Sequence, residues 1–271
     1  MESQTNLLTL GIPFYKNSNP THLSEAILSI LNQSLLPEKI HLIQDGDVCS
    51  ELDSIVNKYK QDFPDLIKII ALPKKGLPYA LNQSIIDCDT KYYARMDSDD
   101  ISFKDRIKKQ VDFLEENNDI DILGAWAIEF ENDYETEKGF INKRPNDKTK
   151  IQEYFHYMNP LIHSTVVFRK NIFDKIGFYN ENFITDQDLE LWSRALKSDL
   201  QIYNIQEPLI YFRVKGRLQR RSQMMAIKRQ IIARYSYNTF SFKLNLLKVS
   251  AIIFRLLPRY FKEWGYKNLR G

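Results

Sequence analysis

The alternation of strand-like and helix-like segments in the first part of the chain constrains the fold most. Four short apolar runs alternate with three stretches in which apolar residues recur at helical spacing. This alternation predicts an α/β fold in which helices flank a mostly parallel sheet. The predicted strands span residues 7–13, 39–44, 66–72 and 92–96, and the predicted helices span 22–33, 50–63 and 77–86.

The first predicted strand is expected to end at Pro13, because proline cannot donate to a strand ladder. Later elements are less regular: we expect helices at 105–117, 171–176 and 188–197, and strands at 123–130, 162–168, 202–205 and 208–214. Residues 132–150 are polar and predict a loop. We therefore expect one domain over residues 1–214 and a basic, helical, amphipathic segment over 215–271.

Polar residues follow the predicted strands of the first part of the chain. They lie at residues 13–15, 45–47, 74–76 and 97–100. Ligands of open α/β sheets bind at the carboxyl ends of the strands, so these clusters predict a ligand site. The chain has neither a Gly-x-Gly-x-x-Gly motif nor a Gly-Lys-Ser/Thr phosphate loop, which argues against dinucleotide-binding and Walker-type sites.

Asp97, Ser98, Asp99 and Asp100 place three carboxylates in one short stretch, between a predicted strand and a predicted helix start at 101–106. Such carboxylates repel one another unless a cation or a solvated turn relieves the repulsion. Hard divalent cations prefer carboxylate oxygens and often bridge to substrate phosphates. The alternative is an acidic turn in which Asp100 or Ser102 caps the next helix.

Composition sets the broad class of protein. Of 271 residues, 43% are hydrophobic and 13% aromatic, which is enough for a substantial core. Residues 1–6 do not resemble a signal peptide, and no apolar run approaches the length of a membrane span. The two cysteines have no metal-like spacing, so we expect a reduced, cytosolic protein.

Charge is distributed unevenly along the chain. After Glu207 the chain has 15 lysines and arginines and a single acidic residue, Glu263. This basic segment needs a partner of opposite charge: a membrane surface, a nucleic acid, a phosphorylated substrate or the acidic body itself. Basic and apolar residues interleave over 240–266, as in helices that lie in a membrane interface. No nucleic-acid module is recognisable, so nucleic acid is the least favoured partner.

Motifs occur at residues 10–15, 42–47, 76–82, 94–102, 160–165 and 177–192. They resemble those of family 2 glycosyltransferases, which have the GT-A fold. The similar segments occur in the order expected for that family, with Asp47 where the family usually has Ser. The resemblance covers roughly residues 7–214.

The resemblance implies a nucleotide-sugar donor, often a UDP-sugar. Residues 7–110 would form the donor-binding half and 111–214 the acceptor half. Pro13 and Tyr15 would border the base and ribose, and Asp45 would hydrogen-bond the base. Further donor contacts, near the ribose or diphosphate, would come from Lys75, Gly76 and Asn82.

The resemblance also assigns roles to the acidic cluster. Asp97 would contact the ribose or the sugar, and Asp99 would coordinate Mn²⁺ or Mg²⁺. Asp100 is a secondary candidate. A metal that bridges the diphosphate would stabilise the charge of the leaving group.

The catalytic base is implied by the sequence that leads into the predicted helix at 188–197. Counting back from Trp192 places the base at Asp188, which could instead be a helix N-cap. Gln187 stands where the family usually has Glu, which leaves Asp186 as a rival base. His163, in an acceptor-side motif, is a secondary candidate whose ordinary role would be structural.

The sequence thus favours a metal-dependent, inverting glycosyltransferase. The acceptor would be a hydroxyl of a surface-polysaccharide or lipid-linked glycan precursor. The basic segment would hold the enzyme peripherally on an anionic membrane surface, at the inner face of the cell membrane. One alternative is a sugar nucleotidyltransferase, although its glycine-rich N-terminal loop is missing. A second is a catalytically inactive nucleotide- or sugar-binding module.

Overall fold

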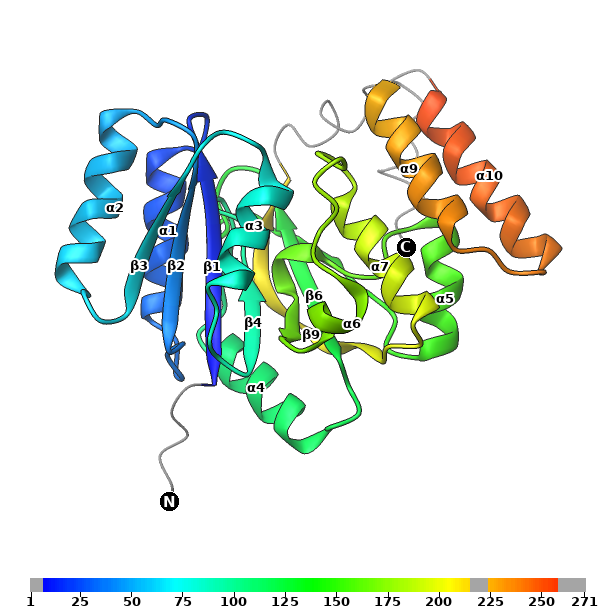
Figure 1. Cartoon of the computed structure of the whole chain (residues 1–271), viewed down its shortest axis with the longest axis horizontal. Helices are drawn as coiled ribbons and strands as arrows, with labels where there is room; N and C mark the ends of the chain where they lie inside the picture. The colour runs from blue at the N-terminus through cyan, green and yellow to red at the C-terminus, as the bar shows by residue number, and fades with distance from the viewer. Residues whose placement is uncertain (1–6, 215–223, 258–271) are drawn as a thin grey trace.

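A mixed sheet runs through the centre of the molecule in the computed structural model, which describes residues 7–214 and 224–257 (Figure 1). The strands within these residues are β1 (Leu8–Tyr15), β2 (Lys39–Asp45), β3 (Ile67–Leu72), β4 (Tyr92–Arg95), β5 (Ile101–Ser102), β6 (Ile122–Phe130), β7 (Phe140–Asn142), β8 (Val167–Arg169) and β9 (Ile202–Arg213). Their order is β3-β2-β1-β4-β8-β6-β9-β5, and β7 pairs with β6. The α/β fold class is confirmed.

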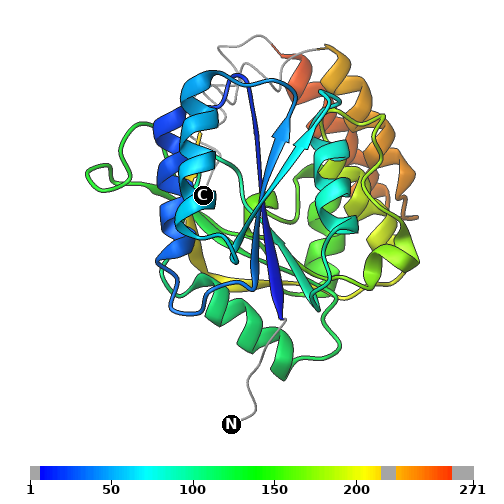
Figure 2. The same ribbon diagram turned by 60° about the vertical axis from the view of Figure 1, so that its left-hand side comes forward.

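Helices cover both faces of the sheet. Figure 2 shows α1 and α2 on one side of the first strands and α3 on the other. The helices are α1 (Pro20–Leu31), α2 (Ser50–Asp62), α3 (Leu77–Ile86), α4 (Arg106–Glu116), α5 (Lys148–Tyr157), the 3₁₀ turn η1 (His163–Thr165), α6 (Ile172–Ile176), α7 (Gln187–Lys197), α9 (Met224–Ser236) and α10 (Phe242–Leu256).

Alternating side chains of the central strands supply two separate cores. Tyr92 and Ala94 of β4 pack with α1, α2 and α4, while Tyr93 between them packs with α3, α5 and α7. Strands β3, β2, β1 and β4 are parallel, as the sequence predicts. Parallel strands need both faces covered, and these two cores satisfy that requirement. The carboxyl ends of β1, β2 and β4 therefore lie at one edge of the sheet.

Strand β1 continues through Pro13 to Tyr15, so the expected end at Pro13 is wrong. The carbonyl of Gly11 accepts a bond from Met96 N at 3.0 Å, on the side of β4. Pro13, two residues on, points to the same side, where the pairing of β1 with β4 has already ended at Gly11 and Arg95. The missing N–H of Pro13 therefore costs no ladder bond.

Other predicted elements shift where side chains compete with the backbone. Residues 162–168 are not one strand, because η1 precedes β8 and the Thr165 hydroxyl donates to the carbonyl of Ile162 at 2.8 Å. Strand β5 precedes α4 where a helix start was expected. The predicted loop at 132–150 contains β7 and the start of α5, where Asp147 accepts a bond from Lys150 N at 3.0 Å. The two predicted strands after residue 201 form one bulged strand, β9.

The described C-terminal residues form two helices that pack on the rest of the fold. Helix α9 contacts α7, and α10 contacts both α5 and α9. Predicted features at residues 215–223 and 258–271 lie outside the described residues. Within the described residues, no helix is both long and apolar enough to cross a membrane. The division at residue 214 stays a prediction.

His156 of α5 offers a test of this packing, because the side chain is fully buried. Neither ring nitrogen has a hydrogen-bond partner among the described residues. Burial, together with the charges of Lys248 and Arg234, lowers its pKa from 6.5 to about 4. Between these values the unfolded chain binds a proton that the folded chain does not, so the stability contribution falls as the pH drops from 6.5 towards about 4.

We expect His156→Phe to raise the melting temperature, and to raise it more at about pH 5 than at about pH 8. Phenylalanine keeps the ring contact with Tyr237, whose centroid lies 5.8 Å away, and removes the titration. Thermal unfolding at the two pH values measures the difference. An equal shift at both would mean that His156 does not titrate with folding.

Candidate active site

The candidate site lies at the carboxyl edge of β1, β2 and β4. Tyr15 ends β1 and its side chain is exposed, while Pro13 is buried two residues earlier. Asp45 ends β2 directly beside Tyr15 in the strand register. The acidic cluster follows β4. The structure thus brings these predicted residues to one edge, as the topology requires.

Asp45 ties the end of β2 to the start of α3. Its carboxylate accepts bonds from the backbone N–H groups of Lys75 at 2.8 Å and Gly76 at 3.0 Å. Gly76 is the N-cap of α3 with φ +98°, which favours glycine. The Lys75 ammonium lies over the Tyr79 ring, 4.5 Å from its centroid. The carboxylate of Asp45 therefore builds the loop that would flank a donor, and its predicted contact with a base stays a prediction.

Asn82 of α3 is buried, and its side chain points towards residues 179–181. It donates to the carbonyl of Tyr179 at 2.9 Å and to Glu181 Oε1 at 3.1 Å, and it accepts from Tyr179 N at 2.9 Å. These bonds join α3 to the segment before α7. Direct contact between Asn82 and a donor stays a prediction.

The acidic cluster is a tight group of carboxylates. Oxygens of Asp97, Asp99 and Asp100 lie within 4.8 Å of one another. Asp97 bonds Arg95 at 2.5 Å and accepts from the Ser164 hydroxyl at 2.9 Å. Asp100 is fully buried and accepts from Arg213 N at 3.0 Å through Oδ1.

Three buried arginines surround this cluster. Arg106 lies within electrostatic reach of Asp100 and donates to the carbonyl of Arg95 at 2.9 Å. Arg213, at the end of β9, donates to the carbonyl of Asp99 at 3.1 Å, to Glu25 at 3.1 Å and to the carbonyl of Asn132 at 3.0 Å. The Arg213 guanidinium therefore joins the acidic turn to α1 and to the backbone of Asn132.

Electrostatics divide the cluster. Burial alone would raise the pKa of Asp97, but the guanidinium of Arg95 holds this pKa below its usual value. Burial, and then the charges of Asp97 and Asp99, raise the pKa of Asp100 well above its usual value. These shifts favour the ionised form of Asp97 and the protonated form of Asp100.

A divalent cation fits this cluster. Asp100 Oδ2 is buried without a hydrogen-bond partner in the described part of the chain, and the other two carboxylates offer oxygens close by. Hard cations such as Mg²⁺ and Mn²⁺ prefer oxygen donors. Asp99 and Asp100 are the residues that would hold it, because the carboxylate of Asp97 already bonds Arg95 and Ser164.

Asp188 lies in the first turn of α7 and is half-buried. Its Oδ2 accepts from Asn159 at 2.5 Å, and its Oδ1 accepts from Leu189 N at 2.8 Å. Asn159, which the sequence interpretation missed, directly precedes the motif at 160–165. Asp186 is the N-cap in the left-handed region, with φ +58°, and accepts from Gln230 of α9 at 3.1 Å.

His163 lies within electrostatic reach of both Asp188 and Asp97. Its Nε2 lies 2.7 Å from the Tyr179 hydroxyl. Burial, followed by the charge of Arg95, lowers its pKa to about 3, against the opposing charges of Asp188 and Asp97. The imidazole is therefore neutral near pH 7, and it lies within electrostatic reach of both carboxylates. The structure thus brings Asp188 and the acidic cluster to the same region.

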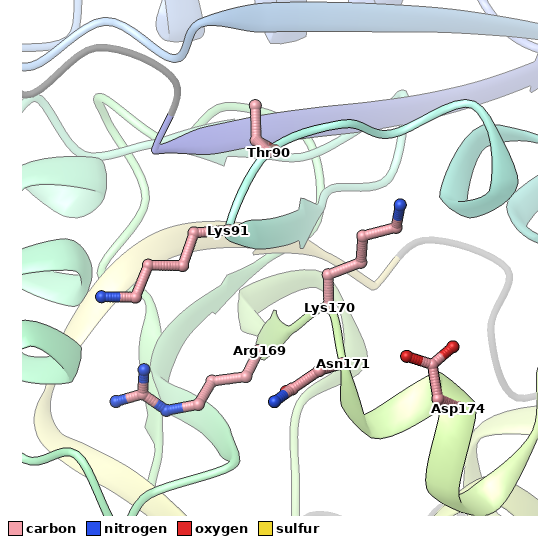
Figure 3. Close-up of a pocket in the computed structure, with 6 residues that line it drawn as sticks. All are labelled: Thr90, Lys91, Arg169, Lys170, Asn171 and Asp174. Atoms are coloured by element: carbon pink, nitrogen blue, oxygen red, sulfur yellow. The ribbon is translucent and has the colours of Figure 1, made fainter.

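Two pockets are lined by residues other than the predicted site residues. A groove of about 940 Å³ between α1 and β9 is lined by aromatic side chains that include Tyr134 and Tyr211. A basic pocket of about 360 Å³ lies where β4 begins and β8 ends, and the side chains of Arg169 and Lys170 point in different directions there (Figure 3). Arg169 donates to the carbonyls of Leu114, Asn117 and Ile120, so it fixes a loop.

Comparison with known proteins identifies the family. The family model described as Glycosyl transferase family 2 matches residues 9–177. A UDP-Gal:alpha-D-GlcNAc-diphosphoundecaprenol beta-1,3-galactosyltransferase of Escherichia coli is 31% identical, over 99% of this chain and 98% of its own. The amylovoran biosynthesis glycosyltransferase AmsE of Erwinia amylovora is 30% identical, over 76% of each chain. The chain belongs to glycosyltransferase family 2.

Solved structures confirm the GT-A fold. S. aureus TarS 1–349 in complex with UDP-GlcNAc has a TM-score of 0.66 at 15% identity, over 92% of this chain and 72% of that chain. The mannosyltransferase PcManGT of Pyrobaculum calidifontis, in complex with GDP-Man and Mn²⁺, has a TM-score of 0.61 at 13% identity, over 99% of this chain and 85% of that chain. At these identities the likeness shows the fold alone.

Asp100→Asn tests whether the cluster is built for a cation. Asparagine can keep the bond from Arg213 N while removing a buried charge beside two others. We expect a higher melting temperature without divalent ions and a smaller stabilisation by MnCl₂ than in the wild type, because ligands stabilise the folded state according to occupancy. The matched control is Asp119→Asn, at an exposed site. An unchanged response to MnCl₂ would exclude Asp100 as a ligand.

Proposed function

We propose that this family 2 glycosyltransferase moves a sugar from a UDP-sugar to a hydroxyl of a lipid-linked or polysaccharide acceptor, with inversion. The proposal rests on one observation: the acidic cluster and Asp188 both lie within electrostatic reach of His163. The name of the Escherichia coli relative specifies a UDP-galactose donor and a diphosphoundecaprenol-linked acceptor, which supports both substrate classes. The TarS complex with UDP-GlcNAc supports the choice of nucleotide.

The donor would lie along the edge formed by β1, β2 and α3. Tyr15 and Pro13 would border the base and ribose, and Asp45 would set the loop of Lys75 and Gly76 against them. Asp97 would contact the ribose or sugar. Asn82 would act by holding the segment at 179–181 in place.

Mn²⁺ or Mg²⁺ held by Asp99 and Asp100 would supply Lewis-acid stabilisation of the diphosphate leaving group. The complex of PcManGT with Mn²⁺ supports this choice of ion. Arg213 and Arg106 would keep the turn in shape, since they bond its backbone and the strand end below it. Residues of the chain therefore preorganise the acidic turn before the substrate binds.

Asp188 would accept the proton of the acceptor hydroxyl. Asn159 orients the carboxylate of Asp188 through a hydrogen bond. The nearby ring of His163 is neutral, so it adds no positive charge beside that carboxylate. A single base opposite the leaving group gives one displacement and inversion at the anomeric carbon, by the geometric argument that applies to inverting hydrolases. Asp186 would serve as the α7 N-cap and as the partner of α9.

Calorimetry of UDP binding with Mn²⁺ tests the donor site. Mutating a residue that hydrogen-bonds to a metal ligand lowers metal affinity by roughly 10–100-fold. Because Asp99 would itself be a ligand, we expect Asp99→Ala to lower the UDP affinity by more than this. Asp119→Ala, exposed and distant in sequence from the cluster, should bind as the wild type does. Equal UDP affinity for Asp99→Ala and the wild type would contradict the proposed metal role.

Asp188→Asn tests the base. Donor binding should persist, while turnover should fall by about 10²–10⁴-fold, the usual contribution of general acid–base catalysis. Asp186→Asn is the matched control, because it lies two residues away and was the rival base. Wild-type turnover in Asp188→Asn together with a loss in Asp186→Asn would transfer the role to Asp186.

A further inference from the structure

Helix α10 exposes a row of apolar side chains to solvent. The exposed positions recur at intervals of four and three residues, so they lie on one face of the helix. Leu246 is 55% exposed and Ile253 is 53% exposed. We call this row the outer stripe of α10; its members are Phe242, Leu246, Val249, Ile253 and Leu256.

The opposite face of α10 is fixed to the protein. Lys248 is fully buried, and its ammonium donates to the carbonyls of Arg234 at 2.9 Å and Tyr237 at 2.8 Å, and to Asn238 Oδ1 at 2.8 Å. The helix also packs on α5 and α9. These contacts set the rotation of α10, so the outer stripe faces solvent. Figure 1 shows α10 at the edge of the molecule, away from β1.

Charge indicates what covers the stripe. Neither α9 nor α10 contains an acidic residue, and Lys228 and Lys243 are exposed on them. A second copy seated on the stripe would bring two basic surfaces together, which is unfavourable. A surface of anionic lipid instead complements the charge, and its acyl region accepts the apolar side chains.

We propose that the outer stripe of α10 lies in the interface of an anionic bilayer, with Lys243 at the level of the lipid headgroups. Lys248 belongs to the segment at 240–266 in which basic and apolar residues interleave, but in the structure it anchors the helix internally. The docking surface is therefore one defined face of one helix.

Docking at this face would also orient the candidate site. Helix α9 lies between α10 and α7, and Gln230 of α9 donates to Asp186, two residues before Asp188. Ser236 of α9 lies within 2.5 Å of Ser193 of α7 through their hydroxyls. Asp188 would then lie at a fixed distance from the lipid surface. This orientation, unlike the docking itself, rests on the proposed function.

Vesicle co-sedimentation of the full chain tests the docking surface. The probes are phosphatidylcholine vesicles with and without phosphatidylglycerol. We expect binding to the anionic vesicles, and we expect the double variant Leu246→Ser, Ile253→Ser to lower the partition coefficient about tenfold or more, because two apolar anchors are lost. Lys243→Glu should lower it about fivefold or more. Because these side chains are exposed, the melting temperatures should stay close to that of the wild type.

The matched control is Ile86→Ser at the end of α3, where the side chain is 57% exposed and lies outside the stripe. It should partition as the wild type does. Equal partition of the stripe variants and the wild type would overturn the proposal. So would a dimer, seen by light scattering, that the stripe variants convert to a monomer. UDP binding measured on the same samples separates these outcomes from a failure of the proposed function.

Discussion

Three buried arginines beside the acidic turn are the constraint on which the candidate site depends. Asp97, Asp99 and Asp100 could not share one turn beside the core unless positive charge lay close by. Arg95 of β4 and Arg106 of α4 supply that charge from either side of the turn in the sequence. Arg213 supplies it from β9, 113 residues after Asp100. The turn therefore exists only when the parallel and antiparallel parts of the sheet are both assembled.

This arrangement has two opposite effects on a cation. The arginines order the carboxylates in advance, which removes the entropic cost of assembling ligands, but their positive charge opposes a further cation nearby. A nucleotide diphosphate would bring negative charge to the same edge. Cation and nucleotide should then favour each other's binding, and by linkage the coupling is reciprocal.

The first half of the fold could be predicted from sequence because its pattern is local. Apolar periodicity and turn residues define β1 to β4 and α1 to α3. The predicted end of β1 at Pro13 was wrong, because β1 tolerates a proline there only where its pairing with β4 has already ended. Long-range pairing could not be predicted: two-residue β5 exists because β9 lies beside it. The acidic cluster stood out as a run of charge, whereas the roles of Arg213 and Asn159 depend on partners distant in sequence.

Asn82 links two parts of the molecule that would handle different substrates. Through three hydrogen bonds to Tyr179 and Glu181, it joins α3, beside the proposed nucleotide site, to the segment that leads into α7. Separating these parts would expose or orphan several buried polar groups at once. Helix α3 and the segment at 179–181 should therefore move as one rigid body when substrates enter and leave.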